Sequence, residues 1–572
     1  MCRHYVRSHH NTGWLVYCVC LGETDMDFDN NWLLSLMIFL PLAGAAAVMA
    51  TPKAQEDLIK GIALLTTLIT AALGAFMLIV FDYGKTADLQ FVVDEDWIGV
   101  INSRYILGVD GMSLPLIALT VFIVPLCIFY TFGHFPEPRN PKAILSLILI
   151  LETGMIGTFV AQDLILFFVF FEVVLLPMFF MIAVWGGDDR RYASLKFFLY
   201  TMFGSALMLV SFLALYFLAD GTIVGDQAQT FSMVALSEGA TLGISRTAQL
   251  WIFAGMFVGF GVKVPMFPFH TWLPDAHTQA PTVGSVILAA VLLKLGTYGF
   301  IRIAIPMLPE AAAAWAPFIG LLAVIGIIYG ALGCLAQRDM KRLIAFSSVA
   351  HMGFVMLGIA TLTDFGINAA IFGMVAHGLI TGMLFFLAGS MKDRYHTLDM
   401  NRLGGLLISA PRMGWILGFC AMASLGLPGL AGFWGEFPAI LASYNPAAIL
   451  SETTFRVYMV VAALGTVLAA GYLLWMLQKT AMGTPTDEFK DNPEITDVKR
   501  YEWITWAPIL ALILFFGLYP RPIFSTTDDA VVKSLTVDIQ GQEVDNCLDS
   551  NGETAGKNCF ANIRNLLEEA GN

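Results

Sequence analysis

Charged residues are scarce in this chain of 572 residues. Asp, Glu, Lys and Arg together make up 13% of it, whereas a soluble protein usually carries about a quarter. The sequence also lacks sets of CxxC pairs, a glycine-rich dinucleotide fingerprint and a Walker loop. It therefore predicts no bound metal or cofactor in this chain. The net charge of −13 is not gathered into one patch, and no basic footprint for nucleic acid is present.

The eight cysteines show no metal-ligand spacing. Three of them, Cys127, Cys334 and Cys420, lie inside apolar runs, where a small hydrophobic side chain is expected. Cys547 and Cys559 lie in a polar C-terminal tail. We hypothesise a disulfide between these two, since the tail is expected outside the cytoplasm, where a disulfide is permitted.

Apolar residues are what the chain has in abundance, at 57%. Apolar runs of about 20 residues, the length of a helix that crosses a bilayer, recur from start to finish. The sequence predicts an all-α polytopic membrane protein with about fourteen transmembrane helices. The expected spans are 31–50, 58–81, 112–134, 142–161, 163–184, 195–219, 248–272, 282–305, 312–335, 341–362, 366–391, 411–441, 455–480 and 503–520.

Orientation follows from the distribution of Lys and Arg between the loops. Loops after odd-numbered spans hold 18 of these residues and loops after even-numbered spans hold five. Basic loops stay in the cytoplasm. We therefore expect the odd loops on the cytoplasmic side and both termini on the opposite, periplasmic side.

The chain divides into six expected parts. Two blocks of five helices, 135–305 and 306–480, each have an interrupted fourth helix, which predicts two inverted repeats with two discontinuous helices. Residues 1–25 fit poorly and indicate a start codon placed too early, with Met26 the first residue, or a leader. The remaining parts are 26–134, with three spans and an external hairpin-like segment within 82–111; 481–520, with a loop and the last span; and the polar acidic tail 521–572.

Several ionisable residues stand in the middle of the expected spans. A charge at the bilayer centre costs about 2.5–3.5 kcal/mol on insertion scales, so these groups must be paired, hydrated or neutral. They are the carboxylates Glu152, Glu172 and Glu436, the lysines Lys263 and Lys294, and the histidines His270, His277, His351 and His377. Asp163 lies at a span boundary and is expected to be solvated.

Each candidate has a structural alternative. Glu152 could simply accept hydrogen bonds from neighbouring helices, and Glu172 with Lys263 could be a static ion pair. A static buried pair can often be replaced by hydrophobic residues without loss, which favours a functional pair. Lys294 and Glu436 have no evident partner in the sequence, which favours groups that gain and lose protons. A single buried histidine is more often a satisfied polar residue, but four of the nine histidines lie in these segments, which favours a chain of protonable groups and water.

The stretch GVKVPMFPFHTWLP places prolines directly after Lys263. Proline removes a backbone donor and interrupts a helix, and freed carbonyls within a membrane need protein or a wet cavity beside them. We therefore expect water near Lys263. Burial disfavours the charge of this lysine and a nearby Glu172 favours it, so movement of the carboxylate would make the lysine release its proton.

Four stretches carry a family resemblance. The sequences GVKVPMFPFHTWLPDAHTQAPTVGSVILAAVLLKLGTYG, FFEVVLLPMFFMIAVWG, QRDMKRLIAFSSVAHMGF and LPGLAGFWGEF resemble the proton-pumping, antiporter-like subunits of respiratory complex I, the NADH:quinone oxidoreductase. The likeness runs from about residue 30 to 520. Sibling subunits carry lysine where Glu436 stands, so the glutamate favours the M-type (chain 4) branch.

The resemblance implies roles for the candidate residues. Lys263 on a discontinuous seventh helix would be paired with Glu172, and a relay through Lys294 and the histidines would end at Glu436. Cofactors would be absent from this chain, with FMN, iron–sulfur clusters and quinone in partner subunits. The expected partners are adjacent antiporter-like chains of the membrane arm, the lipid bilayer, protons and water, in a bacterial inner membrane.

Three other classes of function stay open. A multi-subunit sodium/proton antiporter and the membrane arm of an energy-converting hydrogenase share the lysine, the glutamate and the broken helices. A purely structural membrane scaffold is disfavoured by the charges in mid-span. Neighbouring genes would separate complex I from the first two alternatives. Flavin and iron–sulfur subunits would indicate complex I, small antiporter subunits the antiporter, and a nickel hydrogenase the hydrogenase.

Overall fold

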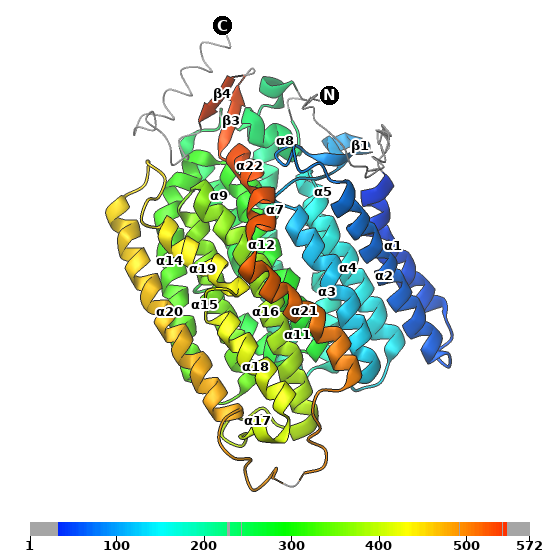
Figure 1. Ribbon diagram of the computed structural model, residues 1–572. Coiled ribbons are helices and arrows are strands. Elements are labelled where there is room, and N and C mark those ends of the chain that lie inside the picture. The colour runs from blue at the N-terminus through cyan, green and yellow to red at the C-terminus, as the bar shows by residue number, and fades with distance from the viewer. Residues whose placement is uncertain (1–31, 226–228, 242, 491, 540–541, 546–572) are drawn as a thin grey trace, which may run out of the picture.

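The computed structural model describes residues 32–225, 229–241, 243–490, 492–539 and 542–545. Figure 1 shows an elongated bundle whose long helices run roughly side by side, with α1 and α2 at one edge and α20 at the other. The β-strands and α22 lie at one end of the bundle and α17 lies at the opposite end. Residues 1–25 and the proposed cysteine pair, Cys547 and Cys559, fall outside the described residues.

Twelve helical segments of the described chain are long and apolar enough to cross a membrane. This number establishes a mostly helical membrane protein. The segments are α1 (Trp32–Ala50), α2 (Glu56–Val80), α3 (Leu114–Gly133), α4 (Pro141–Val160), α5 with α6 (Leu164–Trp185), α7 (Arg190–Leu218), α11 to α13 (Thr282–Met307), α14 (Pro309–Leu335), α15 (Met340–Ala360), α16 (Asp364–Tyr395), α20 (Glu452–Thr480) and α21 (Arg500–Leu518).

The other two stretches expected as spans are divided into shorter helices. One consists of α9 (Arg246–Lys263) and α10 (Trp272–Gln279), and the other of α18 (Pro411–Ser424) and α19 (Ala431–Ala442). A proline ring clashes with the carbonyl four residues earlier. Helix α18 ends at Ser424, four residues before Pro428, and the chain then turns through Gly426 and Gly429, which have φ values of 81° and 93° and need glycine for that reason.

Two further spans have irregular helices. Pro177 divides the fifth expected span into α5 (Leu164–Val173) and α6 (Leu175–Trp185), again with the first helix ending four residues before the proline. The eighth alternates α-helical and π-helical turns, and π-turns often mark functional sites. Its parts are α11 (Thr282–Ile287), η4 (Leu288–Leu292), α12 (Leu293–Gly299), η5 (Phe300–Ala304) and α13 (Ile305–Met307).

Two paired strands lie within 82–111, where the sequence predicts a hairpin-like segment. Strand β1 (Gln90–Ile98) pairs antiparallel with β2 (Ser103–Val109), with η1 (Gly99–Ile101) between them. The tail contains structure that the sequence analysis did not predict, namely α22 (Arg521–Ser534) and the paired strands β3 (Thr536–Ile539) and β4 (Gln542–Asp545). The remaining short elements are η2 (Gly221–Val224), α8 (Met233–Ala235), η3 (Leu236–Ala240) and α17 (Leu406–Ser409).

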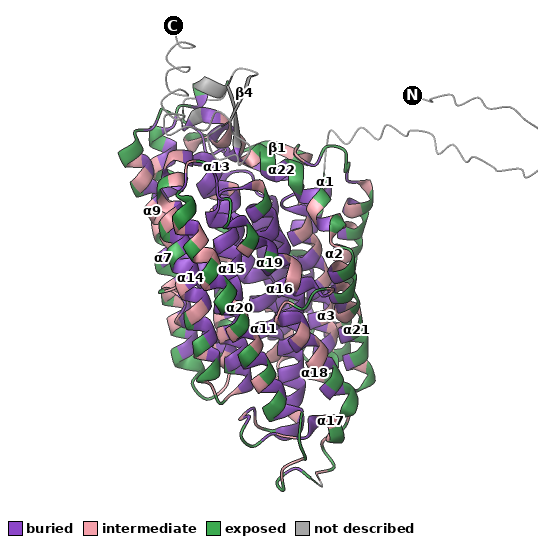
Figure 2. Ribbon diagram, turned by 60° about the vertical axis from the view of Figure 1, so that its left-hand side comes forward, coloured by how far each residue is buried: buried purple, intermediate pink, exposed green. Residues whose placement is uncertain are grey.

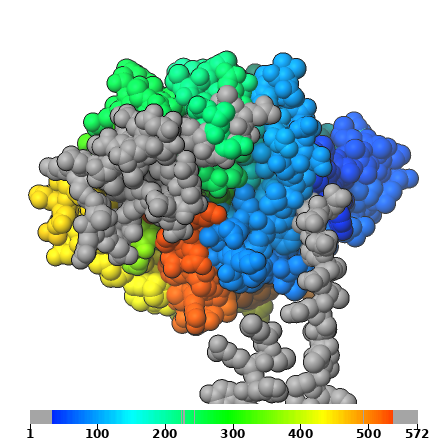
Figure 3. Space-filling view, turned by 90° about the horizontal axis from the view of Figure 1, so that it is seen from above, coloured from blue at the N-terminus to red at the C-terminus, as the bar shows by residue number. Residues whose placement is uncertain are grey.

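Helix α22 contacts the segment directly before the hairpin. The Thr86 hydroxyl, before the hairpin, donates a hydrogen bond to Asp529 (3.3 Å), and Lys533 forms an ion pair with Asp88 (3.3 Å). Seen from above, the orange-red α22 lies against the light-blue segment that contains the hairpin (Figure 3). The residues after the last span therefore pack on the segment after the second one.

Helix α16 occupies the centre of the bundle. The most apolar part of this helix is entirely buried, whereas 28% of the corresponding part of α20 is buried. Figure 2 shows this contrast between a buried interior and exposed outer helices. Helix α16 packs against α3, α11, α15, α18, α19, α21 and α22, so the residues of its middle part are enclosed on every side.

Candidate functional site

The break after α9 has its backbone groups satisfied by protein. Pro265 has no N–H to offer to the Gly261 carbonyl, and the amide of Met266 donates to that carbonyl instead (2.9 Å). The Val262 carbonyl, which Met266 would have bonded in a regular helix, accepts the indole N–H of Trp272 (2.9 Å). Trp272 thus replaces a helical hydrogen bond directly before Lys263.

Lys263 is the last residue of α9 and is 3% exposed. Its Nζ lies 4.6 Å from the centre of the Phe171 ring on α5, a distance typical of a cation–π contact. Glu172, next to Phe171, is half-buried, and the Ser205 side chain lies beside its carboxylate. The structure places the two charges near enough to interact through space, but they are not among the close ion pairs of the described residues.

A cavity beside this break is apolar. It has about 10 Å³ of space for a water-sized molecule and is lined by side chains such as Met266, Phe267, Met352 and Met356. Such a lining offers few polar partners, and a bound water needs 2–4 of them. The expected water beside Lys263 therefore gains no support from this cavity.

Lys294 is fully buried on α12. Its ammonium donates to the Ala289 carbonyl (2.5 Å) and to Nδ1 of His377 on α16 (2.8 Å). Ala289 belongs to the π-helical turn η4, where the helical hydrogen-bond pattern is shifted. The irregular turn thus directs a carbonyl toward the lysine, and the sequence analysis, which found no partner for Lys294, missed both contacts.

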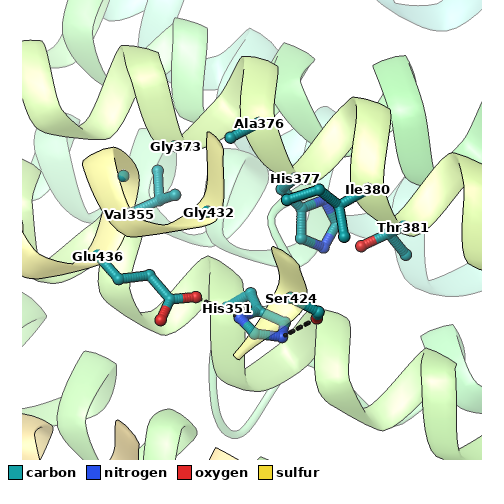
Figure 4. Close-up of a pocket in the computed structure, with 11 residues that line it drawn as sticks. His351, Val355, Gly373, Ala376, His377, Ile380, Thr381, Ser424, Gly432 and Glu436 are labelled. Carbon is teal, nitrogen blue, oxygen red and sulfur yellow. Dashed lines mark hydrogen bonds and ion pairs between the residues drawn. The ribbon is translucent and has the colours of Figure 1, made fainter. Parts of the chain in front are cut away.

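His351 on α15 connects three other helices. Its Nδ1 hydrogen-bonds with Oε1 of Glu436 on α19 (2.5 Å), and its Nε2 with the Ser424 hydroxyl on α18 (3.1 Å) and the Tyr472 hydroxyl on α20 (3.1 Å). Figure 4 shows the Glu436 carboxylate directed toward one side of the His351 ring and Ser424 on the other side. The structure thereby gives Glu436 a close partner that the sequence did not reveal.

A small cavity with several polar side chains in its lining lies between these two groups of residues. It is lined by His351, His377, Thr381, Ser424 and Glu436 among others, with about 20 Å³ of space for water-sized molecules; holding one water takes about 10–15 Å³ on this measure. The rings of His351 and His377 are 6.0 Å apart. Nε2 of His377 and Oε2 of Glu436 are buried without a hydrogen-bond partner among the described residues, and both residues line this cavity.

The structure therefore brings four candidates into one line, Lys294, His377, His351 and Glu436. The other candidates lie outside this line. Glu152 is fully buried on α4 and accepts a hydrogen bond from Thr67 on α2 (2.9 Å). His270 packs against Phe267 and Tyr329, and His277 stacks on Phe385 with ring centres 4.5 Å apart.

The expectation that Asp163 is solvated is wrong. The residue is fully buried and caps α5, since its carboxylate accepts hydrogen bonds from the amides of Ile165 and Leu166 and from Ser103. A carboxylate at a helix N-terminus satisfies free backbone donors. The sequence placed Asp163 at a span boundary, but it did not show that strand β2 covers this residue.

The sequence alone also did not reveal the burial of several cations, among them Arg302 and Lys341. Arg302 on η5 forms an ion pair with Asp110 (2.5 Å) and donates to the Tyr298 hydroxyl (3.0 Å). Lys341 on α15 is 5% exposed and donates to the Ala280 carbonyl (2.5 Å). Both were counted only as loop charges for orientation, and no local signal marks them as buried. Among the described residues, no group of three or more His, Cys, Asp or Glu side chains is placed to hold a metal ion.

Comparison with known proteins decides the family. Residues 161–465 match the family model described as the NADH:quinone oxidoreductase/Mrp antiporter transmembrane family. The NADH-quinone oxidoreductase subunit M of Rhodobacter capsulatus is 41% identical over 495 residues, which cover 85% of this chain and 93% of that protein. This chain belongs to the NADH:quinone oxidoreductase/Mrp antiporter family.

Other members of the NADH:quinone oxidoreductase/Mrp antiporter family are similar over the same length. Chain 4 of the NADH-ubiquinone oxidoreductase of Marchantia polymorpha is 39% identical, with 85% of this chain and 94% of that protein covered. A chain of respiratory complex I from Thermus thermophilus superimposes with a TM-score of 0.75 at 27% identity, covering 88% of this chain and 99% of that one.

The family fold also extends to other complexes. A chain of the Mrp complex from a Dietzia species has a TM-score of 0.75 at 17% identity and covers 88% of this chain and 97% of its own length. At such low identity the likeness shows a shared fold alone.

Proposed function

We propose that this chain is the proton-translocating membrane subunit of an NADH:quinone oxidoreductase, the M-type subunit of respiratory complex I. Its identity of about 40% to such subunits over most of both chains supports this assignment. The observation that carries the mechanism is the line of buried protonable groups from Lys294 to Glu436, with a water-sized cavity in it. Adjacent antiporter-like chains would be its partners, and FMN, iron–sulfur clusters and quinone would lie in other subunits.

In this proposal Lys263 receives or releases a proton according to the distance of Glu172. The cation–π contact with Phe171 would hold the ammonium while the carboxylate stays apart. The proton would then pass to Lys294, to His377 through their hydrogen bond, across the cavity to His351, and to Glu436. Glu152, His270 and His277 would support the route as neighbouring polar groups.

The two broken helices support an architecture of fourteen spans. Counting α9 with α10 and α18 with α19 adds two spans to the twelve continuous ones. The broken pair is then the fourth span in each of two five-helix blocks, 135–305 and 306–480. Because each block crosses the membrane an odd number of times, the second block begins on the opposite side and is inverted relative to the first. The basic loops would face the cytoplasm of a bacterium, with both termini on the periplasmic side.

A sodium/proton antiporter subunit or a hydrogenase membrane arm is the second candidate. The fold shared with the Mrp complex supports a common transport core. The identity to that complex is 17%, against 41% to an oxidoreductase subunit M, which favours the oxidoreductase.

The test is proton translocation by the whole complex in membrane vesicles. We expect Lys263→Ala, Glu172→Ala and Glu436→Gln to leave the complex assembled and to lower NADH-driven proton uptake by about 100-fold, the usual scale of a lost proton-transfer group. Replacement of an exposed loop lysine, Lys53→Ala, serves as the matched control and should leave uptake unchanged. Normal uptake by an assembled Lys263→Ala complex would refute the assignment.

A further inference from the structure

Lys341 is a buried cation that the proposed relay does not use. It is the second residue of α15, where the helix dipole disfavours positive charge, and it is 5% exposed. Its ammonium has three donors, of which one is directed to the Ala280 carbonyl (2.5 Å). No carboxylate forms a close ion pair with it among the described residues, so the ordinary compensation for a buried cation is missing.

Lys341 lies between the loop end of the bundle and its interior. The lysine lies next to the loop that carries Arg338, on the side where the basic loops gather. Its partner Ala280 caps the C-terminal end of α10, three residues after His277. The neighbouring Arg342 points outward and pairs with Asp275 (3.5 Å), so only one of the two adjacent cations is directed inward.

His277 lies near Lys341, because Ala280, which accepts the hydrogen bond of this lysine, is only three residues further along the chain. Its ring is fully buried, and both ring nitrogens lack a hydrogen-bond partner among the described residues. The charges of Lys341 and Lys294 both act on its ring, although neither lysine is within hydrogen-bonding distance of it. A buried imidazole without any partner is costly as a purely structural element, whereas it suits a group that accepts a proton on one nitrogen and releases it from the other.

We propose that Lys341 is a proton-transfer residue that supplies Lys294 through His277 from the side of the basic loops. An N–H bond of the Lys341 ammonium breaks and its proton passes through a bridging water to one nitrogen of His277, since no direct hydrogen bond joins the two side chains. The imidazolium then releases the proton of its other nitrogen, again through water, to a Lys294 that has become neutral by passing its own proton to His377, and water at the loop end reprotonates Lys341. This inference rests on the proposed function, because it extends the same line at the end opposite to Glu436.

The alternative role for Lys341 is to hold the end of α10 as a fixed cation. Two substitutions separate these roles. Lys341→Arg retains the charge and a donor for Ala280, but arginine is not deprotonated in proteins. Lys341→Gln retains a donor without the charge. A fixed cation would tolerate arginine, and a simple donor would tolerate glutamine, whereas proton transfer requires a group that both holds and releases the proton.

The experiment measures NADH-driven proton uptake and its pH profile in vesicles with the complete complex. We expect both Lys341 variants to assemble and to lose at least about tenfold in uptake, while the adjacent control Arg342→Met loses less than about twofold, since its ion pair is exposed. Uptake by Lys341→Arg above half of the unsubstituted level would overturn the inference, and so would failure of both variants to assemble. Lys294→Ala, measured in parallel, separates the two proposals, because normal uptake by that variant would refute the relay itself.

Discussion

At the scale of single residues, buried positive charges are stabilised by different kinds of contact. Lys294 is bonded to a carbonyl and an imidazole, Lys263 lies over an aromatic ring, and Arg302 is paired with Asp110. A paired charge is fixed, whereas a lysine without a carboxylate can lose its proton. The few charged residues in the apolar spans therefore comprise both permanent ion pairs and groups that are suited to proton transfer.

The pair of Arg302 and Asp110 allows a direct test of a fixed charge. The Asp110 side chain is 4% exposed and that of Arg302 is 11% exposed. We expect Asp110→Asn to destabilise the protein by about 3–5 kcal/mol, because it leaves a buried guanidinium without its anion. Thermal unfolding of the purified complex measures this effect, and the double variant Asp110→Leu with Arg302→Met should recover most of the loss. Unchanged thermal stability of Asp110→Asn would show that the pair is not needed.

All four residues in the line were identified from the sequence, but their partners were not. A charge in an apolar run is visible in the sequence, and Lys294 and Glu436 were found for that reason. Ser424 and Tyr472 were missed because they are ordinary polar residues, 73 and 121 positions from the His351 that they contact. Lys341 was missed because it stands at the start of a span, where a lysine usually reaches water.

At the scale of elements, proline accounts for some of the helix ends but does not end a helix at every position, since Pro41, Pro125 and Pro317 lie inside continuous helices. The breaks near Pro265 and Pro428 follow from the missing amide and the ring clash. The π-turns η4 and η5 have no such local mark, and α22 was missed because its 14 residues are too short and polar to resemble a span. The hairpin was found because its β-branched and aromatic residues favour strands.

The contact between α16 and α19 depends on two glycines. A Cβ atom added at Gly435 would lie 2.4 Å from the Cα of Gly373, so the helices touch through their backbones. We expect Gly435→Ala to separate α19 from α16, to move Glu436 away from the cavity and to lower proton uptake by at least about tenfold. Proton uptake and assembly of the complex, judged by native electrophoresis, are the measurements.

Gly418 provides the matched control for this prediction. It lies on α18, and a Cβ atom there would meet no atom within 4 Å. Gly418→Ala should be neutral or stabilise the helix by about 0.5–1 kcal/mol. Equal behaviour of the two alanine variants would mean that the close approach of α16 and α19 is not required.

The docking of α22 is expected to depend on pH. Asp528 on this helix accepts a hydrogen bond from Asn368 on α16 (2.8 Å), and burial, followed by the nearby Asp364, raises the pKa of Asp528 above its usual range. A raised pKa in the folded state means that the protonated form is favoured there. The contribution to docking is therefore present below about pH 4, the ordinary pKa of aspartate, and is lost as the pH rises through the raised pKa.

Hydrogen exchange of the α22 amides, corrected for intrinsic rates, measures this dependence. Protection should fall between about pH 4 and neutral pH in the unsubstituted protein and stay constant in Asp528→Asn. A fall of the same size in both proteins would assign the effect to another group.

At the scale of the whole molecule, α21 connects parts that are distant in the sequence. It packs against α3, α16 and α19 and crosses the front of the bundle in Figure 1. Its first turn is anchored by Glu502, whose two carboxylate oxygens accept hydrogen bonds from the Arg394 guanidinium (both 2.8 Å). The pair is nearly inaccessible, with side chains 3% and 0% exposed.

We expect Glu502→Gln to destabilise the entire bundle, because it leaves a buried guanidinium unpaired at about 3–5 kcal/mol. The exposed pair of Arg402 with Glu488 nearby is the control, and Glu488→Gln should change stability by about 1 kcal/mol or less. Chemical unfolding in detergent measures both. Equal effects of the two substitutions would contradict the role given to the buried pair.

The overall arrangement was the least predictable level. Counting apolar runs established a polytopic helical protein, but it did not reveal which helix stands at the centre, since α16 and α20 are similarly apolar in sequence. Burial on all sides results from contacts between helices that are far apart along the chain, and a single sequence does not record them.

The central position of α16 has a consequence for the surrounding membrane. The apolar part of the helix that bears His377 is entirely buried by other helices, so lipid tails are expected to touch the outer helices and not this part of it. Changes in bilayer thickness or fluidity should therefore alter the periphery first and reach the buried histidines only after several layers of packed side chains have adjusted. The proposed proton path would in this sense be insulated, and its chemistry should vary little among membranes of different lipid composition.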